Sequence, residues 1–377
     1  MFNPSPNAVL INDAAQVART AYGLSSALEP KPFGTGRVHD TFLVESGGRP
    51  YILQRLNDFF QGHEAFGLNW MMVEGAIREQ SDFLFPLLPP IFPDRDGHYV
   101  TSLEGGGGFW RLTGFIEGLP APLTPNGGRE AARLLGVLHR LLNSPTPLNS
   151  LLPLPEGEFT NQRLTGPSDL EALNLHYRRH PRLEELRPLI DSAAEAAALL
   201  PAHPAFLAAF TMRDVVIHGD TKADNFLFSP DGRAQVLLDW DSVGLGNILI
   251  DLAEMLRSWG VPKFLPPEGP PAVGENMAAV LEGYAETGLE LTTLEMELLI
   301  PVLRGTALNL IRRYLTDALA EVYFRWDSAA YPSLYHQNRA RAVKMLHLVD
   351  HLLSNEISLT QTLTEAYSRG MGRRIGF

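Results

Sequence analysis

Apolar and polar residues follow two different spacings along this chain. In the first part, short apolar runs are bounded by glycine, proline and serine, a pattern typical of strands. The runs predict strands at residues 41–44, 51–56, 99–103 and 109–113, and helices are expected at 8–23 and 64–80. The glycine run 105–108 predicts a flexible hairpin loop between the last two strands.

From about Glu117 onward, apolar residues recur at helical spacing, as at Leu134, Leu135, Leu138 and Leu141. Helices are expected at 129–142, within 168–200, and at 276–287, 293–319, 338–353 and 359–368. Thr292 and Glu295 have the spacing of a capping box. The pattern predicts an α+β chain with a small β-rich lobe, residues 1–113, and a larger, mainly helical lobe, residues 114–377.

Composition excludes several classes of protein. The 377 residues carry a net charge of -12, so nothing suggests the basic face that nucleic-acid binding requires. There are no cysteines, which excludes disulfides, thiolate nucleophiles and cysteine-based metal sites, and fits a reducing compartment. The N-terminus lacks the pattern of a secretory signal, and no apolar run is long enough to span a membrane. We expect a cytoplasmic protein with a small-molecule partner, and the sequence leaves its oligomeric state open.

One stretch, Val215–Asp251, carries the strongest chemical signal. An apolar run leads into His218-Gly219-Asp220, and a second run follows Asn225. After the turn residues 229–232, a third apolar run ends at Asp239. These runs predict a hairpin that brings Asn225 and Asp239 together at its open end.

The residue types in this stretch suit phosphoryl transfer. Asp220 is placed to accept the proton of a substrate hydroxyl, and Lys222 to approach the transferred phosphate. Asn225 and Asp239 offer the oxygen ligands that Mg²⁺ prefers. The alternative is a solvated hairpin with ordinary turn acids, which the spacing H-G-D-x-x-x-x-N followed by an aspartate after a strand makes less favourable.

Three neighbours have secondary interpretations. Asp241 either joins the metal ligands or is an exposed acid. Asp251 is expected at the start of a helix. There it serves as the N-cap, supports the catalytic loop, or does both. His218 is expected to hold the loop rather than act as a base.

In the β-rich lobe, Gly34 and Gly36 form a turn that could cover phosphates, although a plain hairpin turn explains them equally well. No lysine stands where a strand lysine would clamp the nucleotide. Gln54 or Arg55 occupies that place, and Arg55 is expected to pair with Glu74 unless it is an exposed edge residue.

A late helix carries Arg312, Arg313 and Asp317, with Tyr323 and Trp326 beyond it. Such a dense set of arginines usually forms a solvated face. Arginine and an aromatic ring together would also suit a sugar, because the ring packs on its apolar face and arginine donates to its oxygens.

The segment 218–251 resembles the aminoglycoside phosphotransferase/choline kinase superfamily, which has the protein-kinase-like fold. Three further segments look like the N-acetylhexosamine 1-kinase branch. They are G-R-V-H-D-T-F-L-V at 36–44, Y-I-L-Q-R-L-N at 51–57 and W-R-L-T-G-F-I-E-G at 110–118. The region around R-Y-L-T-D-A-L at 313–319 is also similar to that branch. One departure is Gly219, where these sugar kinases carry asparagine and the wider superfamily more often has glycine.

The resemblance implies that Asp220 is the general base and that Asn225 and Asp239 hold Mg²⁺. It also implies that the hinge residues Thr113, Phe115 and Glu117 meet the adenine, and that Arg313 and Tyr323 contact the sugar. The expected function is transfer of a phosphoryl group from a nucleoside triphosphate, ATP, to a sugar hydroxyl, the anomeric hydroxyl of an N-acetylhexosamine. The alternatives are a kinase of an aminoglycoside or amino alcohol, a nucleotide-binding regulator without catalysis, and a metal-dependent hydrolase.

Overall fold

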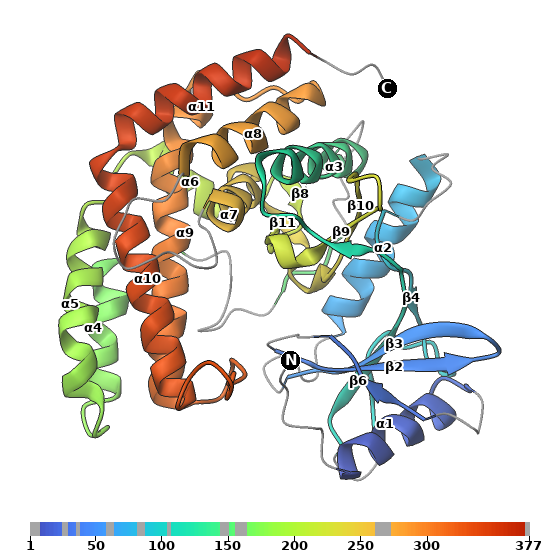
Figure 1. Cartoon of the computed structure of the whole chain (residues 1–377). Helices are drawn as coiled ribbons and strands as arrows, with labels where there is room; N and C mark the ends of the chain where they lie inside the picture. Colours follow the sequence, from blue (N-terminus) through green and yellow to red (C-terminus); the bar gives the residue numbers. More distant parts are fainter. Residues whose placement is uncertain are drawn as a thin grey trace.

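The structure is a computed structural model of the whole chain (Figure 1). It describes residues 8–24, 29–34, 38–57, 64–80, 87–103, 107–143, 151–154, 164–260 and 273–373. The N-terminal part is built on an antiparallel sheet, and the remainder is mostly helical (Figure 1). The predicted α+β arrangement is therefore confirmed, whereas the division of the chain at residue 113 stays a prediction.

The N-terminal sheet has the strand order β1-β2-β3-β6-β4, with β5 also paired to β6. Its elements are α1 (Ala8–Thr20), β1 (Lys31–Pro32), β2 (Asp40–Ser46), β3 (Arg49–Arg55), α2 (Ala65–Gln80), β4 (Ile91–Phe92), β5 (Thr101–Ser102) and β6 (Phe109–Gly114). Alternate residues of a strand face opposite sides of the sheet. Trp110 and Leu112 of β6 accordingly pack with Val17 of α1, whereas Arg111 between them faces the other side and lies over Trp70 of α2.

The second part contains short strands within a helical body. Its elements are β7 (Leu119–Pro120), α3 (Pro125–Asn143), α4 (Pro167–His176), α5 (Leu183–Ala198), α6 (Pro204–Thr211), β8 (Val215–Ile217), β9 (Phe226–Phe228), β10 (Ala234–Leu237), β11 (Gly244–Gly246), α7 (Ile248–Gly260), α8 (Val273–Glu286), α9 (Thr293–Ala320), α10 (Leu334–Ser354) and α11 (Glu356–Met371). One large hydrophobic cluster joins most of these helices. No helix among the described residues is long and apolar enough to cross a membrane.

Helix α9 is at the centre of the helical part, and its residues are buried on nearly all sides. Thr292 and Glu295 form the predicted capping box at its start, with Glu295 N donating to Thr292 Oγ1 at 3.1 Å and Thr292 N to Glu295 Oε2 at 2.7 Å. Helix α6 and the two-residue strands β1, β4 and β7 were not predicted, because they are too short to carry a periodic pattern of their own.

Candidate functional site

The predicted hairpin is present and brings its two polar ends together. Strands β9 and β10 pair antiparallel, with Leu237 opposite Phe226. Just beyond this pair, Leu238 N donates to Asn225 O at 2.7 Å. Asn225 and Asp239 therefore meet at the open end of the hairpin, as the sequence predicted.

Asp220, Lys222 and Asn225 form one connected group on the loop that enters the hairpin. Asn225 Nδ2 donates to Asp220 O at 2.8 Å and to Asp220 Oδ2 at 3.2 Å. The amide nitrogen of Asn225 thus faces Asp220, so its oxygen is the end that can accept a cation. Lys222 Nζ pairs with Asp220 Oδ2 and lies 3.7 Å from Asp239 Oδ2.

Asp239 adopts a left-handed backbone conformation, with φ 65° and ψ 63°. Such a conformation is uncommon for a residue with a side chain and marks a position that the surroundings enforce. Burial alone would raise the pKa of Asp239, but the positive charges of Lys222 and Arg111 lower the pKa below its ordinary value. The carboxylate is therefore ionised and surrounded by cationic and polar groups.

The same electrostatics act on Lys222. Burial disfavours its ammonium form, but the carboxylates of Asp220 and Asp239 more than offset that penalty and raise the pKa of Lys222. Lys222 therefore stays charged between the two acids, where a phosphate group and a metal ion would also be attracted.

Asp251 supports the loop that carries Asp220, as predicted. The Asp251 carboxylate accepts hydrogen bonds from His218 N and Gly219 N, each at 2.7 Å. It is also 2.9 Å from His139 Nε2 on α3, and Thr221 Oγ1 donates to Asp251 O at 2.6 Å. The N-cap interpretation of Asp251 is wrong, because α7 begins at Ile248.

His218 has a structural place in the same loop. Its Nδ1 accepts a hydrogen bond from Asp220 N at 3.2 Å, so the neutral ring donates through Nε2 to Leu238 O at 3.0 Å. Burial lowers the pKa of His218, which favours this neutral form. Nδ1 therefore fixes the backbone of the loop itself, and Nε2 joins the loop to the hairpin.

Gly219 has a positive φ of 81°. Glycine adopts such angles freely, and asparagine tolerates left-handed backbone better than most residues. The difference between glycine and asparagine at this position thus follows from the backbone and does not by itself distinguish between acceptors.

Arg111 is the residue that the sequence interpretation missed on the side of the N-terminal sheet. It is 1 % exposed, and its Nη2 donates to Asp241 Oδ2 at 3.1 Å while Nη1 pairs with Asp241 Oδ1. Gln54 Oε1 accepts from Arg111 Nε at 2.9 Å and from Nη2 at 2.8 Å. The sequence contained one signal for this role, because Arg111 lies between two apolar residues of a strand. A cation buried at such a position requires an acidic partner.

The strand residues expected to replace the missing lysine have other contacts. Gln54 faces Arg111, whereas Arg55 Nη1 lies 3.5 Å from Asp40 Oδ2. The expected pair between Arg55 and Glu74 is wrong, because Glu74 pairs with Arg78 and accepts from Ile91 N at 3.0 Å. The buried cation on this side of the site is thus supplied by β6 and not by β3.

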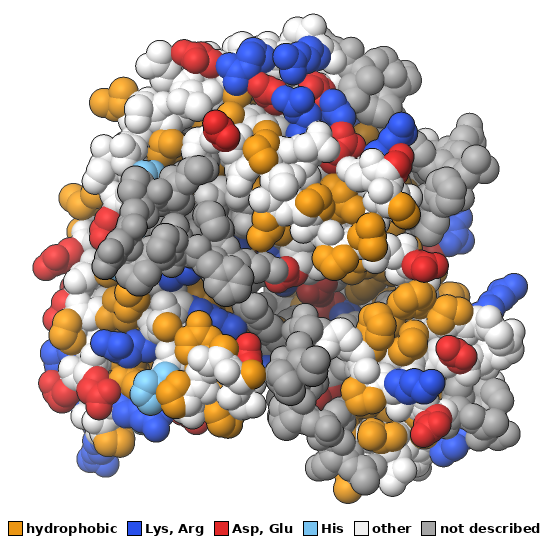
Figure 2. Space-filling model, in the orientation of Figure 1, with side chains coloured by type: hydrophobic (Ala, Val, Ile, Leu, Met, Phe, Trp, Pro, Cys, Tyr) orange, Lys and Arg blue, Asp and Glu red, His pale blue; other side chains and the backbone are white. Residues whose placement is uncertain are grey.

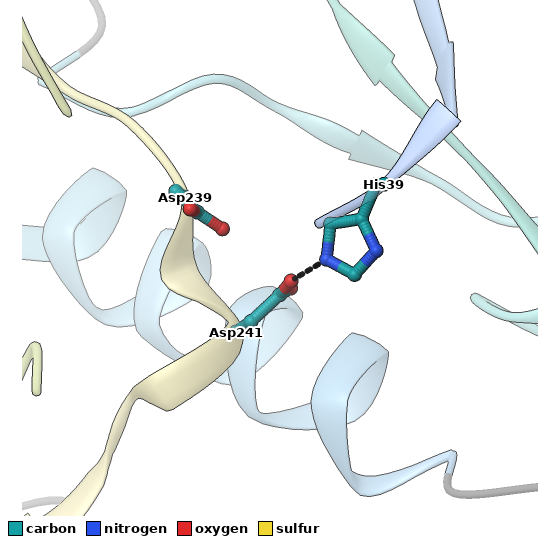
Figure 3. Close-up of side chains that lie close together, drawn as sticks. All are labelled: His39, Asp239 and Asp241. Carbon is teal, nitrogen blue, oxygen red and sulfur yellow. Dashed lines mark hydrogen bonds and ion pairs between the residues drawn. The ribbon is translucent and has the colours of Figure 1, made fainter. Parts of the chain in front are cut away.

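His39, Asp239 and Asp241 present possible metal-ligating atoms within 4.8 Å of one another (Figure 3). Asn57 N donates to His39 Nδ1 at 3.1 Å, so His39 donates through Nε2 to Asp241 Oδ2 at 2.9 Å. Burial, followed by the charge of Arg111, lowers the pKa of His39 to about 3, and the ring is neutral. Asp241 is buried and already neutralised by Arg111, so Mg²⁺ fits Asp239 and Asn225 better than Asp241.

The remaining nucleotide-side residues lie in separate segments. Gly34 is exposed with φ 73°, and Gly36 lies outside the described residues. Thr113 is buried in β6, Glu117 is exposed, and the Phe115 ring meets the ring of Phe33 edge to face at 5.6 Å. Figure 2 shows a hollow between the N-terminal sheet and the helical part, with acidic and basic side chains at its floor.

Arg313 and Tyr323 lie together, as expected of one acceptor wall. Arg313 Nη2 donates to Tyr323 Oη at 3.3 Å, and its guanidinium lies 5.7 Å from the centre of the Phe324 ring. Both residues are buried, so the solvated-face interpretation is wrong for this part of α9. Burial raises the pKa of Tyr323; the positive charge of Arg313 opposes this effect, and the negative charge of Asp220 adds to it.

Asp317 is a second residue whose role the sequence did not indicate. Its carboxylate is fully buried and accepts from Val322 N, Tyr323 N and Phe324 N at 2.7–3.0 Å. Asn338 Nδ2 of α10 donates to the same carboxylate at 2.9 Å. Asp317 thus folds the chain that follows α9 and holds Tyr323 beside Arg313.

Comparison with known proteins agrees with this geometry. A family model described as the phosphotransferase enzyme family matches residues 29–289. A microcompartment-associated aminopropanol kinase is similar in structure with a TM-score of 0.60 and 19% identity, over 90% of this chain and 97% of that one. An aminoglycoside phosphotransferase from Alicyclobacillus acidocaldarius has a TM-score of 0.54 and 15% identity, over 96% and 98%. An amicoumacin kinase bound to AMP-PNP and Ca²⁺ has a TM-score of 0.58 and 12% identity, over 92% and 94%.

Sequence identities this low establish only a shared fold. That fold is the two-lobed, kinase-like one that the sequence predicted.

The support of the loop by Asp251 predicts a pH-dependent stability. Burial would raise the pKa of Asp251, but the hydrogen bond and charge of His139 and the contacts of His218 hold the pKa below its ordinary value. Its carboxylate therefore stabilises the fold above the unfolded pKa of about 4, and this contribution is lost as the pH falls through the folded pKa. We expect Asp251→Asn to lower the free energy of unfolding by about 3 kcal/mol at pH 7.

The measurement is urea unfolding of both proteins between pH 3 and pH 7. The difference in the free energy of unfolding between the wild-type protein and Asp251→Asn should narrow as the pH falls below about 4. Asp191→Asn, an exposed acid on α5, is the matched control and should change little. A difference that is the same at every pH would contradict the role assigned to the carboxylate.

Proposed function

The chain belongs to the phosphotransferase enzyme family, and we propose that it transfers the γ-phosphoryl group of ATP to a hydroxyl of a small molecule. The observation that carries this proposal is the convergence of Asp220, Lys222, Asn225 and Asp239 on one loop and hairpin. A proton acceptor, a cation and two oxygen ligands are the parts that phosphoryl transfer requires. Catalysis then consists of positioning and charge neutralisation.

Each residue has a defined part in this proposal. Asp220 orients the acceptor hydroxyl and takes its proton as the acceptor oxygen bonds to the γ-phosphorus, while the bond from that phosphorus to ADP breaks and ADP leaves. Asn225 Oδ1 and the Asp239 carboxylate hold Mg²⁺, which neutralises the phosphate oxygens when it is bound. Lys222 balances the two acids and is close enough to meet the transferred phosphate. Gly34, Gly36, Thr113, Phe115 and Glu117 are proposed to meet the nucleotide, and Arg55 is proposed only as a more distant positive charge.

For the acceptor, we propose a sugar, the anomeric hydroxyl of an N-acetylhexosamine. The support is the pair of Arg313 and Tyr323, which combines hydrogen-bond donors with an aromatic ring. A buried arginine at the acceptor wall also disfavours a cationic acceptor such as an aminoglycoside. The resemblance to N-acetylhexosamine 1-kinases in the segments 36–44, 51–57 and 110–118 points the same way.

An amino alcohol is the second candidate acceptor. It is favoured by the structural similarity to an aminopropanol kinase. The amine of such an acceptor would have to bind near the buried guanidinium of Arg313. A regulator without catalysis and a metal-dependent hydrolase are less favoured, because the residues for both proton transfer and metal binding are present in one group.

The proposed base gives the first prediction for this function. Asp220→Asn keeps the size of the side chain but cannot take a proton, so we expect the rate of transfer to fall by at least about 100-fold. The Kd of ATP, measured by calorimetry, should change by less than about threefold. Asp224→Asn, an exposed acid on the same loop, is the matched control. Unreduced transfer by Asp220→Asn would show that another group is the base.

A screen of acceptors tests the substrate class. The wild-type protein is mixed with ATP, Mg²⁺ and, one at a time, N-acetylglucosamine, N-acetylgalactosamine, kanamycin, ethanolamine and 1-amino-2-propanol. We expect phosphorylation of an N-acetylhexosamine, detected by mass and assigned to the anomeric position by phosphorus NMR. Product from an amino alcohol alone would exclude the sugar and keep the kinase. Loss of ATP at full rate without any acceptor would favour the hydrolase.

Arg313 is the residue that separates the acceptor site from the nucleotide site. We expect Arg313→Gln to raise the acceptor KM about 10-fold and to change the ATP KM less than about threefold, because its donors face the acceptor. Arg312→Gln is the control, since Arg312 donates hydrogen bonds to Thr165 and Asn309. Equal increases in both KM values for Arg313→Gln would contradict its place in the acceptor site.

A further inference from the structure

His39, which directly precedes β2, and Asp40, its first residue, connect the N-terminal sheet to different parts of the helical region. His39 donates to Asp241, two residues beyond the proposed metal ligand Asp239. The Asp40 carboxylate pairs instead with Arg325, which follows α9, and lies 3.5 Å from Arg55 Nη1. Adjacent residues of extended backbone point to opposite sides, so this dipeptide can contact the metal side and the acceptor side at once.

The segment that carries Arg325 is residues 321–327, which we call the strap. Figure 1 shows the connection from α9 to α10 at the end of the helical region that faces the N-terminal sheet. Asp317 of α9 accepts hydrogen bonds from three backbone amides of the strap, as described above. Gln337 of α10 also donates to Arg325 O at 2.7 Å and accepts from Asp327 N at 2.7 Å. Together, these hydrogen bonds fix the backbone conformation of the strap.

The strap is in contact with both the acceptor wall and the N-terminal sheet. Its Tyr323 bonds with Arg313 and packs in one small hydrophobic cluster with Leu56, Phe66 and Val100. Leu56 directly follows β3, and Phe66 lies on α2. A displacement of the sheet relative to the helical region would therefore move Tyr323 and the Asp40–Arg325 pair together.

The pair itself contributes little to stability. The side chains of Asp40 and Arg325 are 20% and 23% exposed, and water weakens the attraction between the two charges of such a pair. An ion pair of this kind can still select one arrangement of two parts that meet at it. The position of the pair, between β2 and the strap that carries Tyr323, therefore matters more than its energy.

We propose that Asp40 is a positioning residue that couples the nucleotide site to the acceptor site through Arg325 and the strap. The inference rests on the proposed function, because it requires a nucleotide and an acceptor that bind on either side of Asp40. Binding of the nucleotide beside His39 and Asp239 fixes β2, and β2 fixes the strap that carries Tyr323. Because coupling between two sites is reciprocal, the acceptor also strengthens binding of the nucleotide.

Hydrogen exchange of the strap tests the inference without knowledge of the acceptor. The probe is AMP-PNP with Mg²⁺, and the amides followed are those of Val322, Tyr323 and Phe324. In the wild-type protein, the nucleotide should slow exchange of these amides at least about fivefold, the lower end of common coupling factors. Asp40→Asn should bind AMP-PNP within about threefold of wild type and lose this protection. Arg325→Gln should behave in the same way, and the double variant should be no worse than either single one.

Two controls separate coupling from a structural defect. Glu321→Gln removes a carboxylate from the strap that pairs with Arg182 at 3.0 Å and does not reach the sheet, so nucleotide-dependent protection should persist. Asp40→Glu keeps the charge and should restore most of the protection. Circular dichroism confirms that each variant is folded.

The outcomes are distinct. Nucleotide binding that leaves the strap amides unchanged in the wild-type protein would overturn the inference alone, as would full protection in Asp40→Asn. Absence of any AMP-PNP binding by the wild-type protein would overturn the proposed function and the inference with it. With the acceptor identified in the screen, Asp40→Asn should also raise the acceptor KM with little change in its kcat at saturation, whereas a merely destabilised protein would lose kcat.

Discussion

The ion pair between Arg111 and Asp241 is the contact on which the geometry of the site depends. It joins a strand of the N-terminal sheet to the turn that carries Asp239, and both partners are buried. Removal of one partner of such a pair typically costs about 3–5 kcal/mol, because the other charge stays buried without compensation. The planar guanidinium also bonds Gln54, so it fixes the direction as well as the distance of the Asp241 carboxylate. We infer that the pair is retained for this geometry rather than for stability.

The other side of the site is fixed by a separate network. Asp251 bonds two consecutive backbone amides of the catalytic loop, and His139 of α3 orients Asp251 from behind. The loop is also tied to α7 through the bond from Ala223 N to Ser258 Oγ at 2.7 Å. Asp220 and Asp239 are thus held from independent parts of the fold. Preorganised groups of this kind do not have to be reoriented when charge develops during a reaction.

The sequence was most informative where the chemistry is local. Asp220, Asn225 and Asp239 lie on one short stretch whose turns and apolar runs define a hairpin, so their proximity could be predicted. Arg111 and Asp241 are separated by 130 positions, and no local pattern relates two such residues. The sequence left open the choice between Gln54 and Arg55 for a related reason. It depends on which side of β3 faces the site, and that is set by the register with β6, where Gln54 is opposite Arg111.

The backbone of Asp239 has a consequence for how this protein can change. A left-handed conformation costs a residue with a side chain about 1–2 kcal/mol relative to glycine. Replacement by glycine would relieve that backbone strain. A search for more stable variants would therefore tend to select against the carboxylate that the proposed reaction needs most. Stability and activity oppose one another at this single position, so thermostability alone is a poor guide to which variants of this chain remain functional.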